Sequence, residues 1–197
     1  MPTEKWETVR AVASRAYSDA IDAMACIEIL ERGNHLAITK DLNDARAWRA
    51  AKIIKHALLD RILFISMRAI DPIRKPGDRH LRVAFELLTD PAVVAYALVE
   101  AEIVEAQALW ADALSDPRPA KLRHYRNKHA AHISTPDPSV ETPIIIELFG
   151  FARRTASIAE KLAYATGAMA ISLHAQLEAY EESADAFWSR WGEDHTM

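Results

Sequence analysis

Apolar residues recur every three or four positions along most of the chain, the spacing that gathers them on one face of an α-helix. The first such stretch predicts a helix over residues 5–32, ended by Gly33, since glycine readily adopts the left-handed conformation that often follows a helix. The next stretch predicts a second and more apolar helix, which starts near Asp41 or Asp44. This helix ends before Pro72, because the residue preceding a proline avoids the helical conformation.

Prolines and glycines divide the rest of the chain into further amphipathic stretches. They predict four more helical regions, at residues 78–88, 91–114, about 119–132 and 143–191. A break in the last region is expected near Gly150 or Gly167. No stretch predicts a strand, and the isoleucine run at 144–146 is too short to form one. The sequence therefore predicts an all-α fold, an up-and-down bundle of about five to seven helices in a single domain over residues 1–197.

Composition agrees with such a bundle. Hydrophobic residues make up 50% of the chain, enough to bury a core that is expected to include Trp48 and Trp110. The single cysteine, Cys26, excludes an internal disulfide and a cysteine-rich zinc site, and it fits a reducing compartment. The N-terminal residues lack the apolar core of a signal peptide, and no apolar run is long enough to span a bilayer. We therefore expect a cytoplasmic protein with no membrane partner.

Charge is distributed unevenly along the chain. The formal net charge of -4 excludes a polycation that coats nucleic acid unselectively. Between Pro117 and Thr135, however, every ionisable residue is basic. These residues are Arg118, Lys121, Arg123, His124, Arg126, Lys128, His129 and His132. Such a segment is either a local anion-binding site or a solvated helix end, where each cation is favoured by about 0.3–1 kcal/mol. Charge alone leaves both interpretations open.

The order of residue types within this segment says more. Arg126 is followed directly by the polar residue Asn127 and, six positions after the arginine, by His132. The spacing by itself recurs elsewhere in the chain, but here it ends a predicted helix just before a proline-containing loop. The string from Arg126 to His132 resembles the motif of the HEPN superfamily (higher eukaryotes and prokaryotes nucleotide-binding), in its abortive-infection, AbiU-type branch.

Two upstream segments are similar to the same branch. They are Ala57-Leu58-Leu59-Asp60-Arg61-Ile62-Leu63 and Arg68-Ala69-Ile70-Asp71. The leucine-rich stretch after Asp78 resembles it as well, so the resemblance covers a motif-bearing core of about residues 40–135. The C-terminal region, 143–191, agrees only in being helical. Within the chain itself, Arg68 and Asp71 are expected to form an ion pair that ties down the helix end.

The resemblance implies an endoribonuclease that needs no metal ion or other cofactor, with the motif helices of two subunits meeting in a homodimer. It implies catalytic roles for Arg126, Asn127 and His132. Arg123, Lys128 and His129 are expected to bind the RNA substrate, and Arg123 with His129 also forms a second register of the same pattern. A defence or toxin role follows from the abortive-infection branch, and it leaves open a cognate antitoxin protein as a partner.

The chemistry fits these residue types. Attack by an RNA 2′-OH needs a group that exchanges protons near neutral pH, and the ordinary pKa of histidine, about 6.5, suits that task. A guanidinium offers an always-charged, forked set of donors for a phosphorane-like state. In a regular α-helix Arg126 and His132 would be separated by roughly 9 Å of rise and about 120° of rotation. One phosphate therefore more reasonably meets residues from two copies of the chain.

Other interpretations remain. His124, His129 and His132 could suggest a metal site, but no acidic residue lies nearby in the sequence to complete one, so no metal is expected. The branch of HEPN toxins that is silenced by tyrosine nucleotidylation carries a tyrosine two residues after the motif histidine, whereas this chain has Ser134, so that mode of control is not expected. A non-catalytic helical module that binds RNA, a nucleotide or a protein through the same segment is the alternative function.

Overall fold

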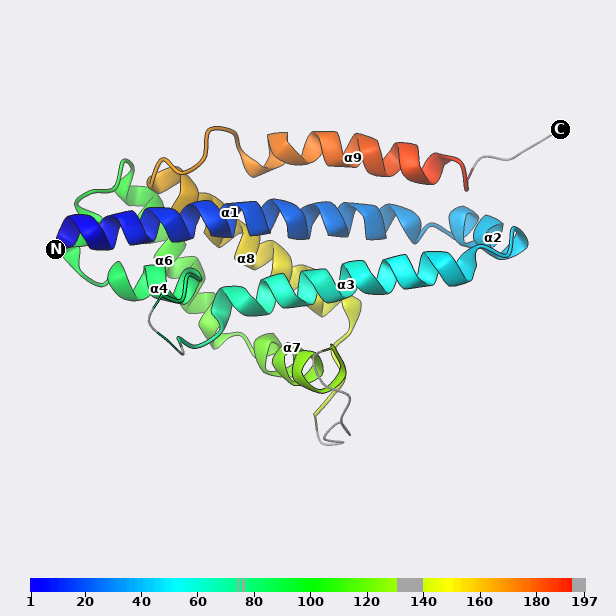
Figure 1. Cartoon of the computed structure of the whole chain (residues 1–197), viewed down its shortest axis with the longest axis horizontal. Helices are drawn as coiled ribbons and strands as arrows, with labels where there is room; N and C mark the ends of the chain where they lie inside the picture. The colour runs from blue at the N-terminus through cyan, green and yellow to red at the C-terminus, as the bar shows by residue number, and fades with distance from the viewer. Residues whose placement is uncertain (74, 76, 131–139, 193–197) are drawn as a thin grey trace.

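The longest helix, α1 (Pro2–Gly33), is the element around which the others pack. Its proline lies in the first turn, where the missing N–H costs nothing. Residues buried along its length, such as Trp6, Val9, Ala13 and Ala20, repeat at three- and four-residue intervals. In the computed structural model α1 lies between α3 and α9, with α8 behind it (Figure 1). The apolar stripe of α1 therefore contacts several helices at once.

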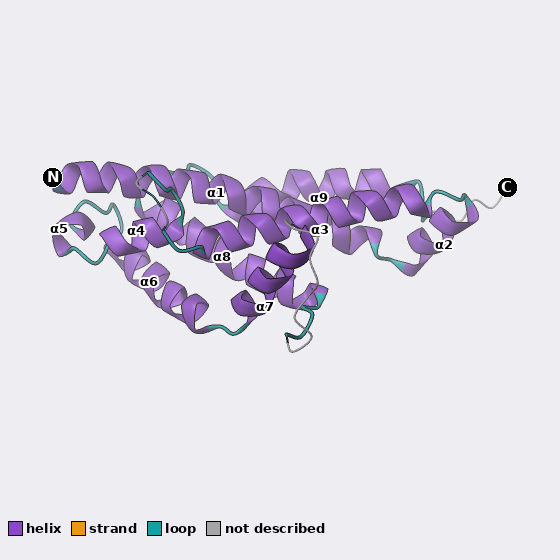
Figure 2. Cartoon of the chain, turned by 60° about the horizontal axis from the view of Figure 1, so that its bottom comes forward, coloured by secondary structure: helices purple, strands orange, loops and turns teal. Residues whose placement is uncertain are grey.

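The structure describes residues 1–73, 75, 77–130 and 140–192, with only the backbone at 129 and 130. After α1 the helices are α2 (Leu36–Asp44), α3 (Trp48–Ile70), α4 (Leu81–Leu87), α5 (Pro91–Val94), α6 (Glu100–Ser115), α7 (Arg118–Tyr125), α8 (Ile145–Ala165) and α9 (Leu173–Ser189). A π-helical turn, η1 (Arg126–Ala130), continues α7. Helices account for nearly all of the regular structure in this part of the chain (Figure 2). The predicted all-α bundle is confirmed.

The described residues form nine α-helices where about five to seven were expected. One extra helix arises because the predicted second helix is preceded by a separate helix, α2, and a break at residues 45–47, where Arg46 has a positive φ of 56°, separates α2 from α3. Another arises because the region 91–114 divides into α5 and α6. The break near Gly167 is confirmed, with φ at +64°, whereas Gly150 lies inside α8.

The main core is formed chiefly by α1, α3, α6 and α8. Phe151, Ile158 and Leu162 of α8 are fully buried against it. Trp110 is also buried and stacks on Phe85, with ring centroids 4.8 Å apart. The expectation that Trp48 belongs to the core is wrong, since its side chain is 43% exposed at the start of α3. No helix among the described residues is both long and apolar enough to cross a membrane.

Close contacts of α9 with the end of α1, and of α8 with the start of α7, hold these helices in place. Trp188 of α9 is buried, and its indole N–H donates to the carbonyl of Ile29 (2.9 Å). Its ring lies against Gly33, where a Cβ atom would come within 2.5 Å of it. At Gly150 of α8 the neighbour is the guanidinium of Arg118, 2.7 Å from an added Cβ. The absence of a side chain at Gly150 thus lets the start of α7 pack closely against α8.

Candidate functional site

The basic segment, the stretch between Pro117 and Thr135, begins at the first residue of α7, shortly after the end of α6. Asp116 follows α6, and its Oδ1 accepts hydrogen bonds from the backbone N–H and the Nε of Arg118, both at 2.9 Å. Arg154 of α8 approaches the other oxygen of Asp116 to 3.1 Å. One carboxylate, almost fully buried, therefore links α6, α7 and α8. The Arg118 guanidinium holds the pKa of Asp116 below its ordinary value, against the opposing effect of burial.

Arg126 is the point at which the backbone changes from an α-helix to the π-helical turn η1. The sequence predicted a helix from about 119 to 132, and the chain is helical from Arg118 to Ala130. The regular α-helical geometry assumed for the motif is wrong over Arg126–Ala130. A π-helical turn hydrogen-bonds to the fifth residue along rather than the fourth, and such turns are often found at functional sites. Rotation per residue in the motif therefore differs from that of the α-helix assumed from the sequence.

The guanidinium of Arg126 is held on two sides. Its Nη1 donates to Oδ2 of Asp71 (2.7 Å), and its Nε and Nη2 both donate to Oδ1 of Asn127 (3.1 Å each). Arg126 is only 8% exposed, although it carries a full positive charge. The side chain is therefore oriented before any ligand arrives, by its sequence neighbour and by a carboxylate 55 residues away.

Asp71 takes a different partner from the one expected. Arg68 does not pair with it, because Nη2 of Arg68 donates to Asp19 of α1 (2.6 Å). Pro72 ends α3 at Ile70, and Asp71 adopts an extended backbone that places its carboxylate against η1. The predicted Arg68–Asp71 pair is thus wrong. A contact between the end of α3 and the motif takes its place.

Arg123 lies on the second side of the Asp71 carboxylate. Its Nε is 3.8 Å from Oδ1, too far for a hydrogen bond, and both atoms are buried without a hydrogen-bond partner among the described residues. Buried polar groups are usually satisfied. Asp71 Oδ1 can therefore accept, and Arg123 Nε can donate, one further hydrogen bond. The arginines of the two competing registers, Arg126 and Arg123, consequently approach the same carboxylate.

His80, at the start of α4, is a further buried group near Asp71. Its side chain is 10% exposed, its Nε2 lies 4.0 Å from Asp78, and its Nδ1 has no hydrogen-bond partner among the described residues. Burial lowers the pKa of His80, while the charges of Asp78 and Asp71 oppose that change. The imidazole is therefore neutral at neutral pH. The sequence offered only another arginine–histidine spacing to draw attention to it.

The folded chain brings carboxylates to most of the described cations of the basic segment, although the segment itself contains no acidic residue. Lys121 pairs with Glu141 and with Glu147, the latter at 3.2 Å, and these two carboxylates raise the pKa of its ammonium group. Arg118 pairs with Asp116, while Arg123 and Arg126 share Asp71. The expected local excess of positive charge is therefore reduced by carboxylates that follow α3 and α6, by one that precedes α8 and by one within α8.

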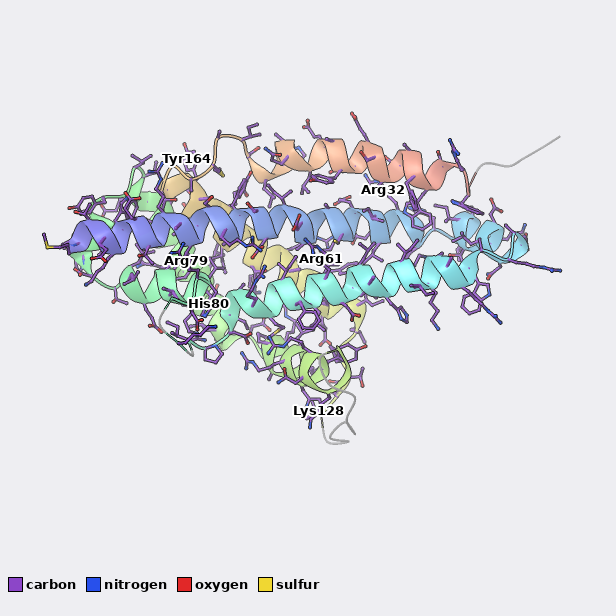
Figure 3. The ribbon with its side chains drawn as sticks, in the orientation of Figure 1. Arg32, Arg61, Arg79, His80, Lys128 and Tyr164 are labelled. Carbon is purple, nitrogen blue, oxygen red and sulfur yellow. The ribbon has the colours of Figure 1, made fainter. Side chains whose placement is uncertain are left out.

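The remaining predicted site residues are only partly described. Asn127 is exposed apart from its contact with Arg126. Lys128 lies at the outer end of the segment, away from α1 and α3 (Figure 3). The side chain of His129 and all of His132 lie outside the described residues. The structure therefore brings together Arg126, Asn127, Arg123 and Asp71.

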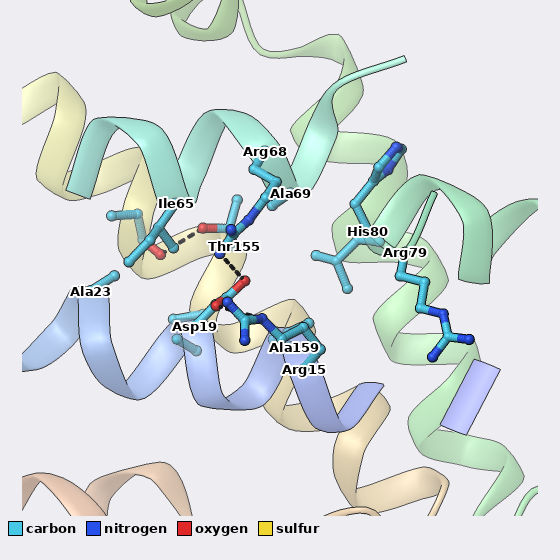
Figure 4. A pocket seen from close by; sticks show the side chains of 15 residues that line it. Arg15, Asp19, Ala23, Ile65, Arg68, Ala69, Arg79, His80, Thr155 and Ala159 are labelled. Atoms are coloured by element: carbon cyan, nitrogen blue, oxygen red, sulfur yellow. Dashed lines mark hydrogen bonds and ion pairs between the residues drawn. The ribbon is translucent and has the colours of Figure 1, made fainter. Parts of the chain in front are cut away.

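A small cavity lies beneath α3, between α1, α4 and α8 (Figure 4). Its volume is about 30 Å³, close to that of one water molecule. Arg68 and Arg15 both pair with Asp19 at its edge, at 2.6 and 3.1 Å. This cavity cannot hold a nucleotide. Among the described residues no group of three histidine, cysteine, aspartate or glutamate side chains is arranged to hold a metal ion.

Comparison with known proteins places the chain in a class and then in a family. The HEPN family described as AbiU2 matches residues 7–187, almost the whole chain. The protein is therefore an all-α HEPN protein, and it belongs to the AbiU2 family. The match extends well beyond the residues 40–135 that carried the resemblance, and it includes all of α8 and most of α1 and α9. No curated protein and no solved structure matches the chain.

The Asp71–Arg126 pair predicts an asymmetric loss of stability. Substitution Asp71→Ala leaves Arg126 charged and buried, and we expect the free energy of unfolding to fall by about 3–5 kcal/mol. Substitution Arg126→Ala should cost less, because Asp71 keeps Arg123 as a second cation. Chemical denaturation measures both changes. Lys40→Ala, which removes an exposed pair with Asp44, is the control and should change little. Equal effects of Asp71→Ala and Lys40→Ala would contradict this account.

Asp116 predicts a dependence of stability on pH. A carboxyl whose pKa is lowered by folding stabilises the fold at pH values above its pKa in the unfolded chain, which is near 3.8 for aspartate. This stabilisation is lost as the pH falls through the pKa of the folded state. At pH 7 Asp116→Asn should reduce the free energy of unfolding by about 1.5–3 kcal/mol. The difference from wild type should shrink below about pH 4. Denaturation curves across this range test it, and a constant difference would refute the assignment.

Proposed function

We propose that the protein is a metal-independent HEPN endoribonuclease that acts in the cytoplasm as a homodimer. The observation that carries this proposal is the fixed guanidinium of Arg126 at the first residue of η1, held by Asn127 and Asp71. Membership of the AbiU2 family supports it, because the same residues form the HEPN pattern in the sequence. The chain then has RNA as its substrate and a role in defence against infection or as a toxin, with a cognate antitoxin as a further partner.

Each residue of the motif has its own role in the proposed cleavage reaction. His132 accepts the proton of the RNA 2′-OH, whose oxygen attacks the neighbouring phosphorus. Arg126 stabilises the negative charge that develops on the phosphoryl oxygens, and Asn127 orients both the arginine and the phosphate. The bond to the 5′-oxygen breaks, and that oxygen takes a proton from a second imidazole. The products are a 2′,3′-cyclic phosphate and a 5′-hydroxyl, with atoms and charge in balance.

Two copies of the chain fit this chemistry better than one. Proton transfer is needed at both the attacking and the leaving oxygen, and a dimer supplies a His132 from each subunit. Arg123, Lys128 and His129 then bind the flanking phosphates. The guanidinium supplies the positive charge that a metal ion supplies in other nucleases, so cleavage needs no divalent cation.

A second function has its own support. Arg126 is buried and neutralised by Asp71, which is also how an arginine with a purely structural role is held. In that case the segment is part of a non-catalytic module that binds RNA, a nucleotide or a protein. Binding of RNA without cleavage distinguishes this function from the first.

The proposal predicts RNA cleavage in the presence of a chelator. Wild-type protein should cut a labelled RNA in EDTA, and Arg126→Ala and His132→Ala should each reduce the single-turnover rate by about 100-fold or more. The rate should follow a bell-shaped pH profile, because the two imidazoles must be in opposite protonation states. Mapping the product ends should give a cyclic phosphate and a free 5′-hydroxyl.

Matched controls separate chemistry from folding. His174→Ala removes an exposed histidine of α9, and Arg10→Ala removes an exposed arginine of α1; both should cleave as wild type does. Arg126→Lys retains a positive charge but cannot contact Asn127 and Asp71 through the same fork, so it should also be slow while remaining folded. Absence of cleavage by wild type, or equal rates in Arg126→Lys, His132→Ala and wild type, would overturn the proposal.

A further inference from the structure

A long groove follows α3 on the side that faces α8. It consists of two adjoining hollows of about 350 and 390 Å³, which share His56, Leu59 and Ile145 in their walls. The first hollow is bounded by Tyr125, the residue directly before Arg126. The second extends along α3 to Trp48. We call this continuous feature the α3 groove.

The positive charge around the α3 groove differs from that of the basic segment. Between Trp48 and Leu59 the helix carries Arg49, Lys52, Lys55 and His56 and no acidic residue. Within the part of the chain that the structure describes, Arg49 and Lys52 form no ion pair with a carboxylate. The cations of α7 and η1, in contrast, are mostly paired. The N-terminal half of α3 is thus a place where positive charge is available to an anionic ligand.

The walls of the α3 groove also carry groups that suit nucleobases. Trp48 is 43% exposed at one end, and the Lys52 ammonium lies 5.7 Å from the centre of its ring. Asn34 and Asn43 line the same hollow and offer amide groups to base edges. An exposed aromatic ring beside cations is how proteins bind single-stranded nucleic acid, with bases stacked on rings and phosphates near the cations.

Lys55 and Asp60 limit what the α3 groove can bind. Lys55 is half-buried and donates to the carbonyl of Gly33 (2.6 Å) and to Asn34 (3.1 Å), so it shapes the wall rather than reaching for a ligand. Asp60 is the one carboxylate among the described residues that line the two hollows, and it lies at the end near Tyr125. The charge therefore favours an anionic ligand most strongly toward Trp48.

We propose that the α3 groove binds a single-stranded segment of RNA that leads to the Arg126 site. This proposal rests on the proposed function, since it extends the substrate path of the same nuclease. From Trp48 to Asp60 the groove follows thirteen residues of α3, roughly 18 Å of helix, which is enough to hold several nucleotides. The apolar side chains of the walls would also suit a protein helix, but Arg49 and Lys52, which pair with no carboxylate in the described part of the chain, favour a polyanion.

Binding of a fluorescent, unstructured RNA to the full chain tests the α3 groove. The chain carries His132→Ala, which prevents cleavage during the measurement. Trp48→Ala should weaken binding by about 5- to 150-fold through loss of stacking, and Trp48→Phe, which keeps an aromatic face, should stay close to the parent. The double substitution Arg49→Gln/Lys52→Gln should reduce the slope of log K against log salt by about 1.4. Arg10→Gln, in α1, is the control and should leave the slope unchanged.

The outcomes separate the groove from the nuclease. If wild type cleaves RNA while Trp48→Ala and Arg49→Gln/Lys52→Gln bind and cleave as their parents do, the groove proposal is wrong and the nuclease stands. If the groove variants lose RNA binding but the wild type never cleaves RNA, the proposal for the α3 groove is supported and the proposed nuclease function is wrong. Thermal denaturation of each variant verifies folding. Unchanged RNA affinity together with loss of a bound partner protein would assign the groove to that partner instead.

Discussion

The ion pair between Arg126 and Asp71 is the contact on which the candidate site depends. A buried guanidinium is tolerated only when it is paired and hydrogen-bonded, and here Asp71 and Asn127 provide both at 2.7 and 3.1 Å. The pair joins the end of α3 to the π-helical turn that follows α7, so the geometry of the motif is set by a helix far away in the sequence. Because the same interaction stabilises the fold and orients the guanidinium, a change at Asp71 acts on the stability of the fold and on the orientation of Arg126 together.

The basic residues cluster along the sequence, but in the folded chain carboxylates from other regions lie beside them. The segment from Arg118 to Lys128 contains no acidic residue, yet Asp71, Asp116, Glu141 and Glu147 approach it from other parts of the chain. These carboxylates hold the basic side chains in defined positions and reduce the field that an RNA would meet there. Arg49 and Lys52, which form no ion pair with a carboxylate among the described residues, lie instead on the first turns of α3, beside the exposed Trp48. Under the proposed function, an RNA is attracted at this place and cleaved at the Arg126 site.

Periodicity in the sequence predicted the all-α fold and most helix ends, because apolar spacing and prolines act locally. It missed the break at Arg46, where neither glycine nor proline marks the positive φ, and it placed Trp48 in the core because a large aromatic side chain is usually buried. Arg126 and Asn127 could be identified from their order along the chain. Asp71 could not be assigned to Arg126, since the pair spans 55 residues and Arg68 offered a nearer partner. The π-helical turn likewise depends on packing that a local pattern does not contain.

A double-mutant cycle on single-turnover RNA cleavage tests the central claim, that Asp71 orients Arg126 for chemistry. Rates are compared for wild type, Asp71→Asn, Arg126→Lys and the double variant, at a temperature where all four are folded. If Asp71 acts through Arg126, each single substitution slows cleavage and the double variant is no slower than Arg126→Lys alone. Independent, multiplicative effects of the two substitutions, or a wild-type rate in Asp71→Asn, would contradict the account.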